Sequence, residues 1–324
     1  MKYSFIIPVK EINDYVRDNI SRILLFEKND FEIIVYPDET TDEVWGKTRQ
    51  IATGPGGPAM KRNLSIRDAK GEILVFIDDD AYPKENFIEV LAKDFDDENI
   101  AAVGGPAITP RESKFWQRVS GATFLSSLSG GFPERYRPMG KKTFVADWPS
   151  VNLSIRKKIF SDLGGFAGDY WPGEDTKLGL DLLTKKNARI LYDPDLIVYH
   201  HRREGLVKHV RQISGYGLHR GFFAKKYPKT SLNWKYFLPS LFVFFIVFGA
   251  IFSYFFRTFI FFYAFGWSVY FVAMLNAFYD IYTHEKNILV TLAASYYIFL
   301  THIFYGFRFL QGLFFTRNLK SKLR

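Results

Sequence analysis

Three long apolar segments constrain this chain more than any other feature of its sequence. They cover residues 236–256, 258–279 and 288–307, and none contains Asp, Glu, Lys or Arg. At a rise of about 1.5 Å per residue, each reaches about 30 Å as a helix, which is the thickness of a bilayer core. Three such runs in succession are hard to bury in a water-soluble domain. We therefore expect about three transmembrane helices.

The formal net charge of +9 is concentrated just before the first apolar segment. By the positive-inside rule this basic block stays on the cytoplasmic side, and residues 206–226 are expected to form an amphipathic helix at the membrane interface, near anionic headgroups. No recognition motif accompanies the charge, so nucleic acid is not an expected partner. The block contains Arg202, Arg203, Lys208, Arg211, Arg220, Lys225, Lys226 and Lys229, against Glu204.

The charges after the apolar segments conflict with this topology. Three spans from a cytoplasmic domain place the last residues outside, whereas a basic tail favours the inside. Either a short segment is re-entrant or the tail is translocated, and residues 307–315 are too short for an ordinary fourth helix. The tail carries Arg308, Arg317, Lys320, Lys322 and Arg324.

The chain has no cysteine, which fits a reducing compartment, and no basic-then-apolar leader precedes its first expected strand. We expect a multi-pass protein of the inner (cytoplasmic) membrane. Its three expected parts are an α/β domain on the cytoplasmic side at residues 1–204, an interface helix and linker at 205–234, and a transmembrane region at 235–324.

Strands alternate with helices in the first part, which predicts a doubly wound, mostly parallel sheet. The expected strands are residues 3–9, 31–36, 73–77, 100–103, 188–192 and 196–199. The expected helices are residues 14–26, 59–69, 87–95, 115–128 and 178–186.

Five apolar residues, 73–77, end abruptly in Asp78, Asp79 and Asp80. Open α/β sheets bind ligands at the carboxyl ends of their strands, and carboxylates gathered there repel one another unless a cation lies between them. Such oxygen ligands suit Mg²⁺ or Mn²⁺ carrying a diphosphate. The alternative is a solvated acidic turn.

Four features, in order, resemble the family 2 glycosyltransferases with a GT-A fold, over roughly residues 1–230. They are the opening strand that ends at Pro8 and Val9, Lys61-Arg62-Asn63 after a Gly-rich loop, the Asp-x-Asp motif at 78–80, and Glu174-Asp175 after Gly173. Two departures accompany them. Pro37-Asp38-Glu39-Thr40 stands where the family usually has Asp-Asp-Gly-Ser, and the Gln-x-x-Arg-Trp motif of processive members keeps only Gln212. The second departure favours transfer of a single sugar.

The resemblance implies a role for each candidate residue. Asp80 is the implied metal ligand, with Asp78 at the ribose or the metal and Asp79 nearby. Arg62 supports the phosphates, and Pro8, Lys10 and Asp38 line the nucleotide pocket, although Asp38 is equally well explained as a turn residue. Asp175 is the implied general base beside Glu174; capping of the following helix is a compatible role for both.

Further contacts with the acceptor or the phosphates are expected from Trp171 and Asn152, and, in the run 200–203, from His201 and Arg202. A turn role is the alternative for Asn152, and for the two adjacent histidines the alternative is that one is buried and the other exposed.

The resulting interpretation is a membrane-anchored, metal-dependent, inverting glycosyltransferase. It would move a sugar from a nucleotide-sugar donor to a lipid or lipid-linked glycan at the cytoplasmic face. Four alternatives stay open: a processive polysaccharide synthase, for which three helices would suffice if the chain forms a homo-oligomer; a polyprenyl-phosphate sugar synthase; a nucleotidyltransferase; and a non-catalytic scaffold.

Overall fold

The strand β4 (Ile73–Ile77) lies in the middle of a sheet, as its unbroken apolar run predicts, and all five of its side chains are buried. β1 (Tyr3–Pro8) and β2 (Phe31–Tyr36) are also fully buried and continue the sheet in parallel. A strand with apolar side chains on both faces must be covered on both faces of the sheet, usually by helices. The computed structural model describes residues 1–28, 30–130, 132–168 and 170–319.

Within these residues, the main sheet has eight strands in the order β3-β2-β1-β4-β9-β6-β10-β8. β9 (Asn152–Arg156) is antiparallel to both of its neighbours, β4 and β6 (Ala102–Gly104). β8 (Thr143–Val145) is antiparallel to β10 (Ile190–Tyr192). The predicted α/β class is confirmed, and the sheet is mixed. β9 is not among the strands expected from the sequence.

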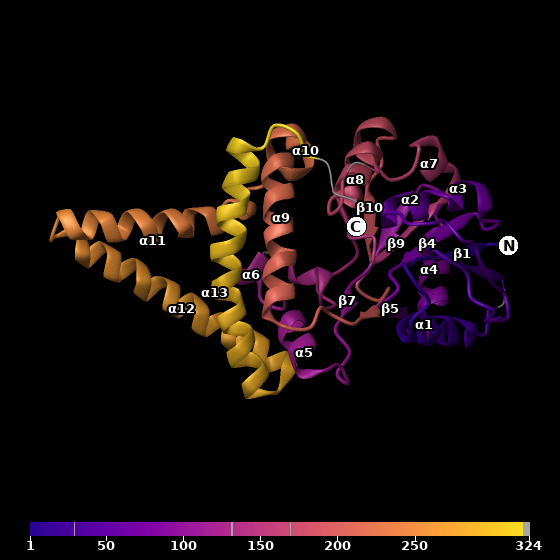
Figure 1. Cartoon of the computed structure of the whole chain (residues 1–324), viewed down its shortest axis with the longest axis horizontal. Coiled ribbons are helices and arrows are strands. Elements are labelled where there is room, and N and C mark those ends of the chain that lie inside the picture. Colours follow the sequence, from indigo (N-terminus) through magenta and orange to yellow (C-terminus); the bar gives the residue numbers. More distant parts are fainter. Residues whose placement is uncertain (29, 131, 169, 320–324) are drawn as a thin grey trace. The chain divides into compact units, whose positions relative to one another are not determined.

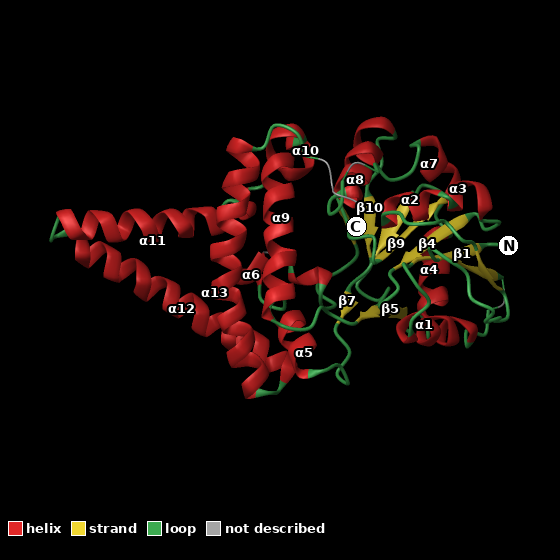
Figure 2. Ribbon diagram, viewed as in Figure 1, coloured by secondary structure: helices red, strands yellow, loops and turns green. Residues whose placement is uncertain are grey.

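Helices cover both faces of this sheet (Figure 2). The amphipathic α1 (Asp14–Leu24) buries Val16, Ile20 and Ile23 on one face, in the same cluster as apolar residues of α4 (Phe87–Phe95). The opposite face is covered by α7 (Lys157–Asp162) and α8 (Glu174–Lys185), in a second apolar cluster. The ends of the strands are therefore left as the ligand-accessible edge.

A second sheet has three strands in the order β5-β11-β7. Its strand β5 follows β4 in the chain, directly after the acidic run. β11 (Val198–His200) pairs antiparallel with β5 (Ala81–Pro83), with His200 opposite Ala81. The backbone N–H of His201 also donates to the carbonyl of Asp80, at 2.9 Å. This register brings a segment from residue 200 next to the acidic run at 78–80.

The chain forms two compact units that do not follow chain order. One contains Met1–Ile108 and Arg137–His201, and the other contains Thr109–Tyr136 and Arg202–Leu319. The segment 109–136, which includes α5 (Phe115–Ala122), thus packs with the C-terminal helices. The tail residues Lys320, Lys322 and Arg324 lie outside the described residues.

In the second unit, α9 (Leu206–Lys226) packs alongside α13 (Ile288–Leu310) (Figure 1). Glycines on α9 allow close backbone approach: a Cβ built on Gly221 would lie 2.1 Å from the carbonyl oxygen of Phe309. His209 is buried between α5 and α13, and its ring nitrogens lie 2.9 Å from Ser120 Oγ and 3.2 Å from Thr301 Oγ1. Burial lowers the pKa of His209 to about 4, which keeps the ring neutral.

Among the described residues, three helices are long and apolar enough to cross a membrane by length and composition: Trp234–Phe255, Phe259–Glu285 and Ile288–Phe315. The last includes residues 307–315, which continue α13 and end in a π-helical turn (Gln311–Phe315) rather than forming a separate segment. α11 (Leu238–Phe255) and α12 (Phe259–Glu285) form a helical hairpin.

The remaining elements are short. They are β3 (Thr48–Gln50), α2 (Pro58–Asn63), α3 (Ser65–Asp68), β7 (Ala107–Ile108), α6 (Ser127–Gly130), the 3₁₀ turns Pro133–Arg135 and Trp234–Tyr236, and α10 (Pro228–Ser231).

Candidate functional site

The carboxyl ends of β1 and β2 are held together by a buried lysine. Lys61, from α2, donates from Nζ to the carbonyl of Val9 at 2.6 Å and forms an ion pair with Asp38. The N–H of Asp38 donates to the carbonyl of exposed Lys10, at 2.9 Å, and Pro8 is buried at the end of β1. The structure thus brings Pro8, Lys10 and Asp38 to one sheet edge; their role in nucleotide binding stays a prediction.

Arg62 connects the two acidic motifs. Its side chain is buried, and its Nη2 lies 2.5 Å from Asp78 Oδ1 while its Nη1 lies 3.3 Å from Glu174 Oε1. A buried guanidinium is costly unless its charge is paired, and two carboxylates from distant parts of the chain supply that pairing here. The surface ion pair that would have been the simplest alternative role for Arg62 is therefore excluded.

Three side chains from the acidic run and β11 form a group able to hold a cation. The ligand atoms of Asp78, Asp80 and His200 all lie within 4.8 Å of one another. His200 Nε2 lies 3.1 Å from Asp80 Oδ1, because the β5–β11 register sets His200 opposite Ala81. Two carboxylates and one imidazole are a donor set that divalent metals accept.

Asp79 lies apart from this group and is oriented by α1. Its Oδ2 accepts a hydrogen bond of 3.3 Å from Asn13 Nδ2, and Asn13 is also the N-cap of α1. Burial, followed by the charges of Asp80 and Asp78, raises the pKa of Asp79 to about 7. Its predicted contact with the nucleotide stays a prediction.

Glu174 and Asp175 begin α8, and they have different environments. Glu174 is buried, and burial and the neighbouring Asp175 raise its pKa to about 7 while Arg62 lowers it. Asp175 is partly exposed, and its Oδ1 accepts from the N–H of Thr176 at 2.7 Å. Glu174 is thus occupied with Arg62, and Asp175 is the more accessible carboxylate.

A third carboxylate, which is not among the residues predicted from the sequence, lies at the same helix start. Asp147 Oδ2 accepts a hydrogen bond of 3.1 Å from Thr176 Oγ1. Gly179 permits this approach, since a Cβ there would lie 2.3 Å from the carbonyl oxygen of Ala146. Asp147 therefore anchors the first turn of α8, which carries Asp175.

The other predicted contacts have varied surroundings. Asn152 is fully buried, and its Nδ2 donates to the carbonyls of Leu196, at 2.7 Å, and Pro106, at 3.3 Å, which gives it a structural role. Its predicted contact with an acceptor has no support in this geometry. Trp171 is partly exposed near the start of α8.

The run 200–203 divides between the two compact units. His201 packs its ring 4.7 Å from that of Tyr15, in the first unit. Arg202 belongs to the second unit, where its Nε lies 3.3 Å from Thr109 Oγ1 and its guanidinium covers the Tyr136 ring. His201 and Arg202 were the predicted contacts in this run, whereas the β5–β11 pairing brings His200 to the carboxylates.

Residues 4–164, about half of the chain, match the sequence profile described as glycosyl transferase family 2. The chain is similar to the pre-mycofactocin glycosyltransferase of Mycobacterium tuberculosis, with 28% identity over 173 residues that cover 53% of this chain and 36% of that protein. It therefore spans well under two thirds of this relative.

The chain is also similar to a Methanococcus voltae protein, dolichyl N-acetyl-alpha-D-glucosaminyl phosphate 3-beta-D-2,3-diacetamido-2,3-dideoxy-beta-D-glucuronosyltransferase, with 20% identity over 62% of this chain and 66% of that protein. Among solved structures, the mannosyltransferase PcManGT from Pyrobaculum calidifontis, in complex with GDP-Man and Mn²⁺, aligns with a TM-score of 0.49 and 17% identity over 68% of this chain and 62% of its own.

Proposed function

Because this chain belongs to the family 2 glycosyltransferases, we propose that it transfers one sugar from a nucleotide-sugar donor to an acceptor at a membrane surface. The observation that carries the proposal is the convergence of Asp78, Asp80 and His200 beside the Arg62–Glu174 pair. The candidate cation site, the buried guanidinium of Arg62 and the accessible carboxylate of Asp175 support this proposal together. Such an arrangement suits a reaction whose leaving group is a diphosphate.

We propose that Asp78, Asp80 and His200 hold Mn²⁺ or Mg²⁺. The fit rests on the close approach of their ligand atoms and on the two carboxylates, of which Asp78 also pairs with Arg62. The imidazole nitrogen favours Mn²⁺ over Mg²⁺, which prefers oxygen ligands. A bound divalent cation would neutralise the charge that develops on the departing diphosphate.

Asp175 is the proposed general base. The acceptor oxygen forms a bond to the anomeric carbon, the bond from that carbon to the diphosphate breaks, and the acceptor proton passes to Asp175. Attack from the face opposite the leaving group inverts the anomeric centre. Asp175 suits this role because it is partly exposed and fixed by the N–H of Thr176, whereas buried Glu174 positions Arg62.

A lipid or lipid-linked glycan is the proposed acceptor, at the cytoplasmic face. Three apolar helices support a site near a bilayer, and one relative is named for action on a dolichyl-linked sugar phosphate. A polyprenyl phosphate is the second candidate. A phosphate acceptor is already anionic and needs no base, so the two candidates differ in their need for Asp175.

The test uses purified protein in nanodiscs of host lipid, with radiolabelled nucleotide sugars and Mn²⁺. We expect label from one donor to enter the organic phase, and Asp175→Asn to abolish this transfer if the acceptor is a hydroxyl. Retained transfer in Asp175→Asn would identify a phosphate acceptor. Asp162→Asn is the matched control, because Asp162 is an exposed helical carboxylate paired with Lys186. Release of nucleotide without any glycosylated product, from every donor, would contradict transferase activity.

A further inference from the structure

α9 and α13 run in parallel, side by side, in the second compact unit (Figure 1). His209 meets Thr301 near the start of α9, Gly221 meets Phe309 further along, and Lys225 Nζ donates to the carbonyl of Thr316, at 2.9 Å, near its end. α9 therefore packs along its whole length against the C-terminal half of α13 and the turn that follows it.

The N-terminal half of α13 packs against α5 and against the short helix α6 that follows it. Val119 and Ala122 of α5 share one buried cluster with Val290, Ala294 and Ile298 of α13. At the middle of α13, His302 Nε2 lies 2.8 Å from the carbonyl oxygen of Leu128. α6 is a single turn, so its terminal backbone groups have no intrahelical partners, and such groups occur at membrane depth only where protein or water surrounds them.

The charges on α9 exclude it from the hydrocarbon. Lys208 and Arg211 are exposed in its first two turns, Lys225 and Lys226 are exposed in its last turn, Arg220 lies between them, and α9 contains no Asp or Glu. A charged residue costs roughly 2.5–3.5 kcal/mol at the centre of a spanning helix, so Arg211 and Arg220, which lie inside the ends of α9, oppose its burial in the hydrocarbon. If α13 crossed the bilayer, it would carry this charged helix into the core along with it.

The α11–α12 hairpin has the opposite character. Among the described residues of these two helices, Ser240 and Gly249 of α11 and Ala277 and Ile281 of α12 are the buried ones, and three of these four lie at the base of the hairpin. Beyond the base, the two helices pack on each other through aromatic rings, as Phe245 does on Tyr263 and Phe252 on Phe259.

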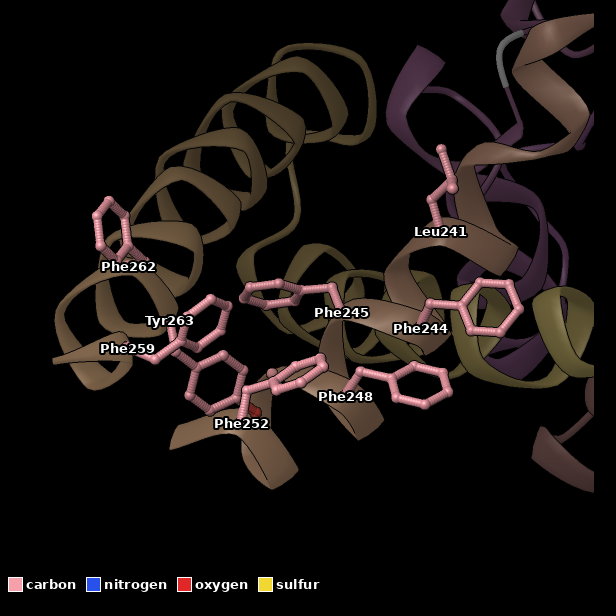
Figure 3. Close-up of a pocket in the computed structure, with 9 residues that line it drawn as sticks. Leu241, Phe244, Phe245, Phe248, Phe252, Phe259, Phe262 and Tyr263 are labelled. Atoms are coloured by element: carbon pink, nitrogen blue, oxygen red, sulfur yellow. The ribbon is translucent and has the colours of Figure 1, made fainter. Parts of the chain in front are cut away.

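An apolar cavity of about 420 Å³ lies between these helices, lined by the aromatic side chains that Figure 3 shows. The outward surface of the hairpin is also apolar, and Arg257 at its tip is the first charge after Lys235. α11 is about 27 Å long, close to the roughly 30 Å of a bilayer core. The hairpin therefore has the length and the surface of a membrane-spanning pair.

We propose that only the α11–α12 hairpin crosses the bilayer, and that α13 lies with α9 along the membrane surface on the side of the α/β domain. The exposed apolar residues of α13 support this placement, because they lie on one face at helical spacing, where they can enter the interface. They are Ile288, Leu289, Leu292, Tyr296, Phe304 and Phe307 of α13, and Phe314 and Phe315 of the π-helical turn that follows it.

This topology resolves the charge conflict in the sequence. Two spans return the chain to the side on which it entered, so Arg308 and Arg317 lie on the same side as the basic residues of α9. All of these cations then satisfy the positive-inside rule and face anionic headgroups. The proposal concerns membrane topology and does not depend on the proposed enzymatic activity.

The chain has no cysteine, so single cysteines report topology without a prior mutation. Arg257→Cys marks the hairpin tip, Lys286→Cys the α12–α13 loop, Asn318→Cys the end of the described chain, and Val44→Cys an exposed position of the α/β domain. Each variant is treated with a membrane-impermeant maleimide in right-side-out and in inverted vesicles. Detergent-solubilised protein gives the full-labelling reference, and monodisperse elution confirms folding.

We expect Cys at 44, 286 and 318 to be labelled from one side and Cys at 257 from the other. Labelling of position 318 from the same side as 257 would establish a third span and overturn the proposal. Labelling of all four positions from one side would show that the hairpin does not cross, which also overturns it. A position 318 that reacts only in detergent would lie within the bilayer and contradict a surface location.

Discussion

Arg62 Nη1 lies 3.3 Å from Glu174 Oε1, and the same guanidinium contacts Asp78. The two residues are far apart in the sequence, and both side chains are buried. This pair joins α2 to the start of α8 and so connects the candidate cation site to the candidate base. A geometry of this kind ties the stability of the fold to the arrangement of the site.

Arg62→Ala should therefore reduce both stability and activity. Removing one partner of a buried charge network leaves the other charges uncompensated, at a cost of roughly 3–5 kcal/mol. Denaturant unfolding in detergent measures this loss, and nucleoside diphosphate release measures the activity. Arg67→Ala is the control, because Arg67 lies on the next helix, is exposed and pairs with the adjacent Asp68. Equal stability of both variants would show that the Arg62 pairs contribute nothing to the fold.

Glu174→Gln and Asp175→Asn should separate in their effects. Asp175→Asn should lower kcat by about 10²–10⁴-fold with little change in unfolding temperature, as expected for loss of a general base. Glu174→Gln should lower the unfolding temperature as well, because it removes the counter-charge of Arg62. Thermal unfolding and initial rates, measured on the same preparations, distinguish these outcomes. A large loss of stability in Asp175→Asn would make that residue structural instead.

His200→Ala should weaken Mn²⁺ binding by at least about tenfold. Loss of a residue that only supports a metal ligand already lowers metal affinity by about 10–100-fold, and His200 is proposed as a ligand itself. Electron paramagnetic resonance of free Mn²⁺ gives the affinity directly, without any need to know the sugar. His201→Ala should leave Mn²⁺ affinity unchanged, because the His201 ring packs on Tyr15 and is not part of the cation group. If both histidine variants bind Mn²⁺ like the wild type, His200 is not a ligand.

Asp94 predicts a pH dependence of stability. Burial raises the pKa of Asp94 to about 6. Lys142 opposes this rise, because its ammonium contacts Asp94; it also lies 3.0 Å from Asp193. Because the folded state binds this proton more tightly than the unfolded chain, the stabilisation is complete below about pH 4 and is lost as the pH rises through about 6. Asp94→Asn should flatten the dependence of the unfolding midpoint on pH between 4 and 7. An unchanged slope would assign the dependence to other groups.

The sequence predicted most of the elements that have a strong local pattern. β4 was predicted with the bounds that the structure has, because five apolar residues end at three carboxylates. α9 was also predicted with its observed bounds. Local periodicity is sufficient in such cases because the pattern itself determines which face is buried.

Features that depend on long-range pairing were not accessible in this way. β9 is antiparallel between two strands that come earlier in the chain, and Asn152 at its start is polar yet fully buried. His200 reaches Asp80 only through the β5–β11 register, so the sequence could offer a run of histidines but not the one that faces the carboxylates. The association of residues 109–136 with the C-terminal helices is likewise tertiary.

The central claim is that sugar transfer by this chain requires a divalent cation held by Asp78, Asp80 and His200. The most direct test measures nucleoside diphosphate release from the active nucleotide sugar, with acceptor lipid present, as Mn²⁺ is titrated into metal-stripped protein. We predict that the activity rises with Mn²⁺ until it saturates and that EDTA abolishes it. In Asp80→Ala and His200→Ala, the activity should need a higher Mn²⁺ concentration or be absent. Full activity of the metal-stripped wild type, matched by both variants, would contradict the claim.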